Sequence, residues 1–224
     1  MGALGDLVWT DLEGRRPVLV VPVGSLEQHG PHLPFDTDTR IAVAVARAAT
    51  ERRADTVLGP SIGIGASGEH SAFPGTLSIG TEALTTVLVE LVRSADAFAG
   101  TVLVNGHGGN IDAVRAATAR SHDEGRIVHA WFPRIPDGDA HAGRTETSIL
   151  LALDPTCVRV DALAPGVTTP VTELHERLRT EGVRPVSPTG VLGDPVGASA
   201  REGAALFDAL VDDLRARLDE WFPT

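Results

Sequence analysis

The chain has 224 residues and a formal net charge of −11 at pH 7, with 30 acidic against 19 basic residues. This balance argues against nucleic acid or an anionic membrane as the main partner, since both bind clustered Lys and Arg. No apolar run is long enough to cross a bilayer, and the single cysteine, Cys157, suits a reducing cytoplasm and excludes an internal disulfide framework.

Strands and helices are predicted to alternate through most of the chain. The first strand is a nearly continuous β-branched run of the kind that is buried on both faces of a parallel sheet. Strands are expected at 18–23, 56–58, 101–104 and 127–132, and amphipathic helices at 40–53, 82–99 and 111–121. This order predicts an α/β fold of three layers, α/β/α, with a mostly parallel central sheet, in a single domain that spans 1–224.

The C-terminal part is predicted to be less regular. A short helix is expected at 145–153, and residues 164–197 are rich in Pro and Gly. We expect this second segment to form a subunit interface or a pocket wall. Ser199 and Glu202 form a capping-box pattern before an amphipathic closing helix at 200–221.

Potential metal ligands are concentrated in residues 24–39, GSLEQHGPHLPFDTDT, directly after the first strand. Glu27 and His29 are two residues apart, so in an extended chain their side chains point the same way. Two prolines prevent a regular helix in this segment. We therefore expect a stiff loop that folds back and brings Asp36 or Asp38 towards the same point.

Two later segments carry further candidates. His107 lies in NGHGGN after the third strand, and His141 and Glu146 lie in HAGRTET. Ligands of parallel sheets bind beyond the carboxyl ends of the strands, where the first two loops are expected to meet. Imidazole mixed with carboxylate suits Zn, Fe or Mn, and bridging carboxylates allow two ions about 3.5–4 Å apart. Such a pair activates water and polarises a carbonyl, as amide hydrolysis requires.

Four segments together resemble the signature segments of the creatininase family, metal-dependent hydrolases of cyclic and linear amides. They are VGSLEQHGPHLPFDTDT, GEHSAFPGTLSIG, NGHGGN and HAGRTETS, and they follow one another in the family's order between residues 23 and 148. The resemblance implies a metal-bound active site in which Asp38 bridges two divalent ions. It also implies that His141 is the catalytic proton donor or acceptor and that Glu146 lies near the metals. The metal ligands that it implies are Glu27, His29, Asp38 and His107.

One position departs from the creatinine hydrolases, which have a glutamate ligand two residues after the second-loop histidine. This chain has Gly109 there. We expect Glu146 to supply the missing carboxylate, as a metal ligand as well as a catalytic residue, and we do not expect creatinine to be the substrate.

The segments DTDTRIA, FPGTLSIGTEAL and HAGRTETS are most similar in sequence to one branch of the family. That branch releases a C-terminal, Val-Tyr-derived fragment from a modified precursor peptide. The alternative is a small amide: a formamide hydrolase of the flavin or deazaflavin type, or another cyclic amidohydrolase. The alternative from another class is a non-catalytic binding module with a structural metal. The resemblance also implies a homo-oligomer, a hexamer or larger.

The remaining polar residues of these motifs have simpler interpretations. His32 is expected to be structural or to support a ligand, and Asp36 to form a turn beside Asp38. Asn110 is interpreted as a helix N-cap. The pair Glu69–His70 is expected either to border the pocket or to form a satisfied loop pair.

Overall fold

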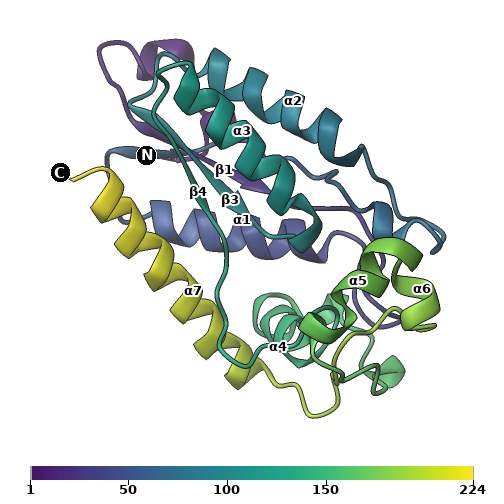
Figure 1. Cartoon of the computed structure of the whole chain (residues 1–224). Coiled ribbons are helices and arrows are strands. Elements are labelled where there is room, and N and C mark those ends of the chain that lie inside the picture. Colours follow the sequence, from purple (N-terminus) through teal and green to yellow (C-terminus); the bar gives the residue numbers. More distant parts are fainter. Residues whose placement is uncertain (1, 224) are drawn as a thin grey trace.

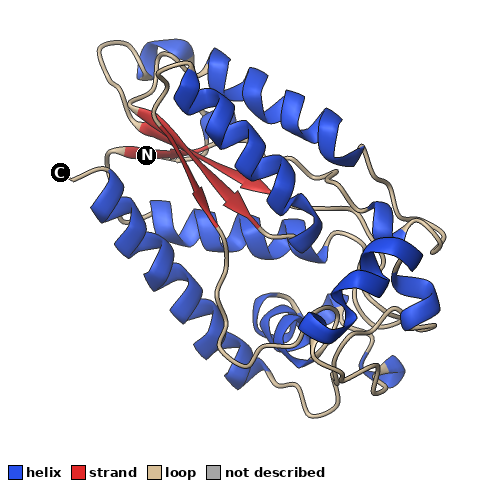
Figure 2. Ribbon diagram, in the orientation of Figure 1, coloured by secondary structure: helices blue, strands red, loops and turns tan. Residues whose placement is uncertain are grey.

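Four parallel strands form the centre of the computed structural model, which describes residues 2–223, and helices cover both faces of the sheet (Figures 1 and 2). The strand order is β2-β1-β3-β4, and every neighbouring pair is parallel. The strands are β1 (Val18–Val23), β2 (Thr56–Leu58), β3 (Gly100–Asn105) and β4 (Val128–Trp131). The predicted α/β fold with a parallel sheet is therefore confirmed.

Seven α-helices and six short 3-10 helices accompany the sheet in residues 2–223. The α-helices are α1 (Thr37–Thr50), α2 (Gly80–Ser94), α3 (Ile111–Asp123), α4 (Arg144–Leu153), α5 (Val171–Glu181), α6 (Val183–Val186) and α7 (Ala200–Trp221). The 3-10 helices are Leu4–Asp6, Trp9–Asp11, Gly68–His70, Gly108–Asn110, Pro155–Cys157 and Val160–Ala162. None of the helices described is both long and apolar enough to pass through a membrane.

The alternation of side chains along β1 divides the core into two layers. Leu19, Val21 and Val23 pack with buried residues of α2 and α3 on one face of the sheet. Val18 and Val20 face the opposite way and pack with α1 and α7. Because successive strand residues point to opposite faces, an unbroken apolar strand requires helices on both sides. This produces the three-layer α/β/α arrangement.

Several helix boundaries differ from the prediction by one to five residues, and the start of α1 matters for the site. Helix α1 begins at Thr37 rather than at residue 40, after a turn in which the Thr37 hydroxyl donates to Pro34 O at 2.7 Å. Asp38 therefore lies in the first turn of α1 and not in the loop before it. Helix α2 ends at Ser94 instead of residue 99, because Ala95 and Phe98 form turns.

The Pro- and Gly-rich segment 164–197 lies against the loops at the carboxyl end of the sheet. It contains α5 and α6, which Figure 1 shows beside these loops. Leu192 and His141 exchange backbone hydrogen bonds, and Arg184 donates to Ala72 O at 2.7 Å. The segment thus covers the side of the molecule where the candidate ligands gather.

Helices α4 and α7 pack closely where Gly203 meets Ser148. A Cβ atom at Gly203 would overlap the carbonyl of Ser148. Polar contacts join the same two helices, since the Ser199 N–H donates to Ser148 Oγ at 3.1 Å and Arg144 pairs with Glu202 at 2.9 Å. Ser199 also accepts from Glu202 N at 3.3 Å, as the capping-box pattern predicts.

We predict that Gly203→Ala destabilises the fold, although alanine is the better helix former by about 0.5–1 kcal/mol. The added methyl group overpacks the α4–α7 contact, which typically costs about 1–3 kcal/mol. Urea unfolding measures the change. Gly5→Ala is the control, because a Cβ there meets nothing within 4 Å. Equal or higher stability of Gly203→Ala would contradict the close approach of the two helices.

Candidate metal centre

The candidate ligands converge at the carboxyl ends of β1 and β3, where the first turns of α1 and α4 also point. Glu27 and His29 follow β1, Asp38 opens α1, and His107 follows β3. Four of the predicted side chains, those of Glu27, His29, Asp38 and His107, have relative exposures of 0%, 1%, 2% and 6%. Carboxylates in the first turn of a helix are stabilised by the helix dipole, which favours Asp38 and Glu146 in their positions.

One group of donor atoms consists of Glu27, Asp38 and His107. Nε2 of His107 lies 3.0 Å from Glu27 Oε2, and Nδ1 of the same ring lies 3.1 Å from Asp38 Oδ2. One ligand atom from each residue lies within 4.8 Å of the others. The group therefore offers two carboxylates and one imidazole to a single ion.

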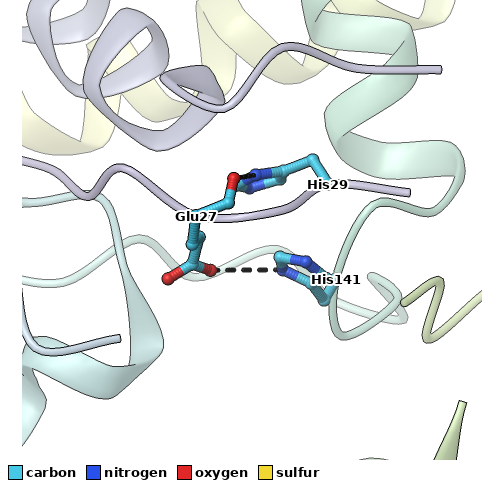
Figure 3. Close-up of side chains that lie close together, drawn as sticks. All are labelled: Glu27, His29 and His141. Atoms are coloured by element: carbon cyan, nitrogen blue, oxygen red, sulfur yellow. Dashed lines mark hydrogen bonds and ion pairs between the residues drawn. The ribbon is translucent and has the colours of Figure 1, made fainter. Parts of the chain in front are cut away.

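A second group consists of His29, Asp38 and Glu146. Nδ1–H of His29 donates to the Glu27 carbonyl at 3.0 Å, so Nε2 is the ring atom available to a ligand (Figure 3). That atom lies 3.1 Å from Asp38 Oδ1 and 4.0 Å from Glu146 Oε2. A backbone carbonyl that accepts from the far nitrogen is the usual partner of a metal-ligating histidine. Asp38 belongs to both groups, as a bridging carboxylate would.

His141 approaches the same centre from the segment before α4. Figure 3 shows its ring beside the Glu27 carboxylate, and Nδ1 lies 3.6 Å from Glu27 Oε1. Glu27, His29 and His141 form a third group of possible ligands within 4.8 Å. The structure therefore brings together all six residues that the sequence singled out, from three separate segments.

The donor set fits divalent cations. Both carboxylate oxygens of Glu27 are buried and accept no well-aligned hydrogen bond from residues 2–223. Burying an unpaired carboxylate costs several kcal/mol or more, and here a second carboxylate, that of Asp38, lies in the same cluster. Imidazole and carboxylate donors without thiolate match Zn, Fe and Mn. A cation between these atoms would offset the negative charge and satisfy the oxygens of Glu27.

The same interactions shift the pKa values of the cluster. Burial opposes the charged form of Glu27, but the adjacent His107 lowers the pKa of Glu27 to about 2. Burial also opposes protonation of His29, yet Asp38 raises the pKa of His29 to about 10. Burial raises the pKa of Glu146 to about 7, although 22% of its side chain remains exposed. The first two shifts favour a charged pair of carboxylate and imidazolium, whereas the shift of Glu146 favours its neutral form.

Neighbouring groups hold the carboxylates in place. The Ser25 hydroxyl donates to Asp38 Oδ2 at 2.7 Å. The backbone N–H of Ala142 donates to Glu146 Oε2 at 2.6 Å, and Ala142 has the uncommon φ of 51°. Such positive φ values in residues other than glycine are strained and tend to occur at functional sites. The strained backbone here aims an N–H at a candidate ligand.

Three of the simpler interpretations are resolved by the structure. His32 is buried and lies 2.9 Å from Thr147 Oγ1, so it packs the loop onto α4. Asp36 pairs with Arg40 at 2.7 Å on the surface and does not reach the centre. Asn110 is the N-cap residue of α3, as predicted, but its side chain makes no capping hydrogen bond. It accepts instead from Ala66 N at 2.8 Å and donates to Gly24 O at 2.9 Å, joining three loops.

The pair Glu69–His70 borders the centre, and the sequence left its role open. Nε2 of His70 lies 3.3 Å from Glu27 Oε1, and its ring is only 4% exposed. Glu69 Oε1 lies 3.5 Å from Nε2 of His107. Gln28 was missed, although its amide touches both His70 and His141. A glutamine between two ligand candidates carries no motif of its own, so sequence offered no signal for it.

Gly109 is explained by these neighbours. A Cβ at this position would lie 2.5 Å from Glu69 Oε1 and 2.5 Å from His107 Nε2, and it would also overlap Ala66 O. Any side chain at 109 is therefore excluded as long as Glu69 and His107 keep their places.

Comparisons with known proteins agree with this geometry. The family model for creatininase, described as creatinine amidohydrolase, matches residues 5–218. The mycofactocin precursor peptide peptidase of Mycolicibacterium smegmatis is 49% identical over 227 residues, which cover 98% of this chain and 92% of that protein.

Solved structures show the same fold. A creatininase described with Mn has a TM-score of 0.80 at 27% identity, over 99% of this chain and 98% of the other. A mutant creatininase described as of the Zn-Zn type gives the same TM-score of 0.80 at 27% identity, again over 99% of this chain and 98% of the other.

We predict that the chelator-treated protein loses stability between about pH 7 and pH 10. This range begins above the pKa of Glu146, which is raised to about 7, and ends at the pKa of His29, which is raised to about 10. Since folding raises the pKa of His29 from 6.5 to about 10, its contribution is complete below pH 6.5 and disappears as the pH approaches 10. Urea unfolding at several pH values measures the slope, which His29→Gln should reduce. A stability independent of pH over this range would contradict the charged pairing with Asp38.

Proposed function

The chain belongs to the creatininase family, and from this premise we propose that its buried acids and imidazoles form a two-metal centre that hydrolyses a C–N amide bond of a peptide. The observation that carries the proposal is the position of Asp38 between His29 and His107, at 3.1 Å from a nitrogen of each ring. One carboxylate with an imidazole on either side could be shared by two adjacent ions.

We assign the two ions to separate sets of residues. Glu27, Asp38 and His107 would hold the first, and His29, Asp38 and Glu146 the second. Bound divalent ions, for which Zn, Fe and Mn are the candidates, polarise a carbonyl and activate water at neutral pH. The protein keeps the donors dry and fixed, since Ser25 holds Asp38 and the Ala142 N–H holds Glu146.

His141 is the group proposed to move the proton. Its Nε2 lies 2.8 Å from the Gln28 carbonyl, which can only accept, so the proton of the neutral ring is on Nε2. The lone pair of Nδ1 then faces the centre. Burial lowers the pKa of His141 well below its ordinary value, which keeps the ring neutral and able to accept a proton. Nδ1 can pass that proton to the leaving amine.

The proposed substrate is a modified precursor peptide, cut to release its C-terminal, Val-Tyr-derived fragment. The relative that is 49% identical carries the name of a precursor peptide peptidase. A cavity of about 270 Å³ lies beside Glu146, between α1, α7 and the segment after β4. Its walls include Ile41, Trp131, Ile135 and Leu210, which suit a bulky apolar or aromatic side chain.

We further propose that residues 1–224 act as one catalytic unit and assemble into a homo-oligomer, a hexamer or larger, in the cytoplasm. The family resemblance supports the assembly, and the single cysteine suits a reducing cytoplasm. Light scattering of the metal-loaded protein tests the assembly.

We predict that Glu27→Ala and His107→Ala lose both bound metal and turnover, because each removes a donor from the first ion. His141→Ala should keep the metal and lose about 10²–10⁴-fold in rate, the usual contribution of general acid–base catalysis. Metal analysis and turnover are measured on the same samples. His175→Ala on the exposed face of α5 is the control. Full turnover of the first two variants after chelation would refute the metal mechanism.

The substrate assignment is tested by incubating the metal-loaded protein with the modified precursor peptide and, separately, with a formamide, followed by mass spectrometry. Release of the C-terminal fragment is the expected result. Deformylation without peptide cleavage would instead identify a small-amide hydrolase. Tightly bound metal with neither product would indicate a structural site, since a structural metal has no coordination position open to water.

A further inference from the structure

The side-chain amide of Gln28 has a fixed orientation. Its Oε1 accepts from the backbone N–H of Gly30 at 2.9 Å, and its Nε2 donates to the backbone carbonyl of Gly190 at 3.2 Å. A backbone N–H can only donate and a carbonyl can only accept, so the two ends of the amide cannot be exchanged. Gly190 has a φ of 82°, and a Cβ there would overlap Gln28 Oε1. Only glycine allows this approach.

The side-chain amide of Gln28 has a second N–H, which donates a hydrogen bond to His70. Nε2 of Gln28 lies 2.8 Å from Nδ1 of His70 and 3.0 Å from Nε2 of His141. Nε2 of His141 already donates its proton to the backbone carbonyl oxygen of Gln28 at 2.8 Å, so this nitrogen has no lone pair with which to accept a hydrogen bond. Nδ1 of His70 is therefore the acceptor of the second N–H.

His70 and His141 therefore face the same oxygen, Oε1 of Glu27, one with a protonated nitrogen and the other with an unprotonated nitrogen. With Nδ1 accepting, neutral His70 carries its proton on Nε2, which lies 3.3 Å from Glu27 Oε1. His141 carries its proton on the far nitrogen, and its bare Nδ1 lies 3.6 Å from the same oxygen. The two rings stand close together, with centroids 4.5 Å apart. One ring faces Glu27 with a donor and the other with an acceptor.

We propose that His70 is a positioning residue of this centre, and that Gln28 holds it as the Nε2–H tautomer so that it directs the carboxylate of Glu27. His70 Nε2 lies 3.3 Å from Oε1 of Glu27 without a well-aligned hydrogen bond, so its attraction for this oxygen is electrostatic. Oε2 lies beside His107 at 3.0 Å and is available to an ion. The same glutamine keeps Nδ1 of His141 free for proton transfer. The role in catalysis rests on the proposed function, whereas the tautomers and the hold on Glu27 do not.

The tautomers are tested by ¹⁵N NMR of the imidazole rings in the full-length, zinc-loaded protein. The expected spectrum of His70 has a bare Nδ1 and a protonated Nε2, assigned by loss of these signals in His70→Gln. Gln28→Glu keeps the size of the side chain but removes the donor, so it should move the His70 proton to Nδ1. A wild-type His70 that is protonated on Nδ1, or on both nitrogens, would overturn the proposal.

The hold on Glu27 is tested by two variants of similar size. His70→Leu has no donor, whereas His70→Gln can place an N–H where Nε2 was. Loss of a group that orients a metal ligand typically costs 10–100-fold in metal affinity or activity. We expect such a loss of zinc affinity, measured by competition with a chelator, in His70→Leu and its recovery in His70→Gln. His175→Leu, at an exposed position of α5, should bind zinc as the wild type does.

Turnover of the modified precursor peptide adds an independent readout. His70→Leu and Gln28→Glu should lower kcat with little change in KM, because neither residue is assigned a contact with the substrate. Wild-type zinc affinity and kcat in His70→Leu would refute the positioning role. If the wild type fails to cut the peptide while the NMR and zinc results hold, the substrate assignment fails and the role of His70 stands.

Discussion

The organisation of this protein depends on the burial of several carboxylates in one cluster. Glu27 and Asp38 are withdrawn from water, and Glu146 approaches them at the mouth of the same cluster. Ionised carboxylates are costly to bury together unless positive charge offsets them. His29 and His107 supply that charge when protonated, or in neutral form would bind the cations that supply it. The hydroxyl of Ser25, the N–H of Ala142 and two helix N-termini hold the acids where either can happen.

The fold connects this centre to the hydrophobic layers. Parallel strands bring their carboxyl ends to one edge, so residues far apart in the chain meet without a long excursion of the backbone. Helix α4 carries Glu146 in its first turn and contacts α7 only two residues later, where Ser148 meets Gly203. Packing between these helices therefore sets the position of a proposed ligand. Overpacking at Gly203 should disturb metal binding as well as stability.

Much of this arrangement could be predicted from local patterns, and the remainder depended on contacts between distant segments. The bounds of β1 and of the closing helix α7 follow from an unbroken apolar run and an apolar period with a Ser199 cap, and both agree with the structure. The ligand candidates were recognisable because acids and imidazoles repeat at the ends of strands. Asn110 was predicted correctly as the N-cap of α3, but its side-chain partners, Ala66 and Gly24, come from other loops and left no local signal. The contact between Gln28 and His70 depends on Gly190, which fixes the amide of Gln28 and lies more than a hundred residues away.

The crowding around Gly109 limits how this site can change. Alanine or any larger residue at 109 collides with the carboxylate of Glu69 and the ring of His107, so a new acidic side chain cannot be added while Glu69 stays in place. A substitution at 109 is therefore coupled to the position of Glu69. An acidic side chain could occupy position 109 only if the carboxylate of Glu69 left this space and both the His107 ring and the Ala66 carbonyl moved with it.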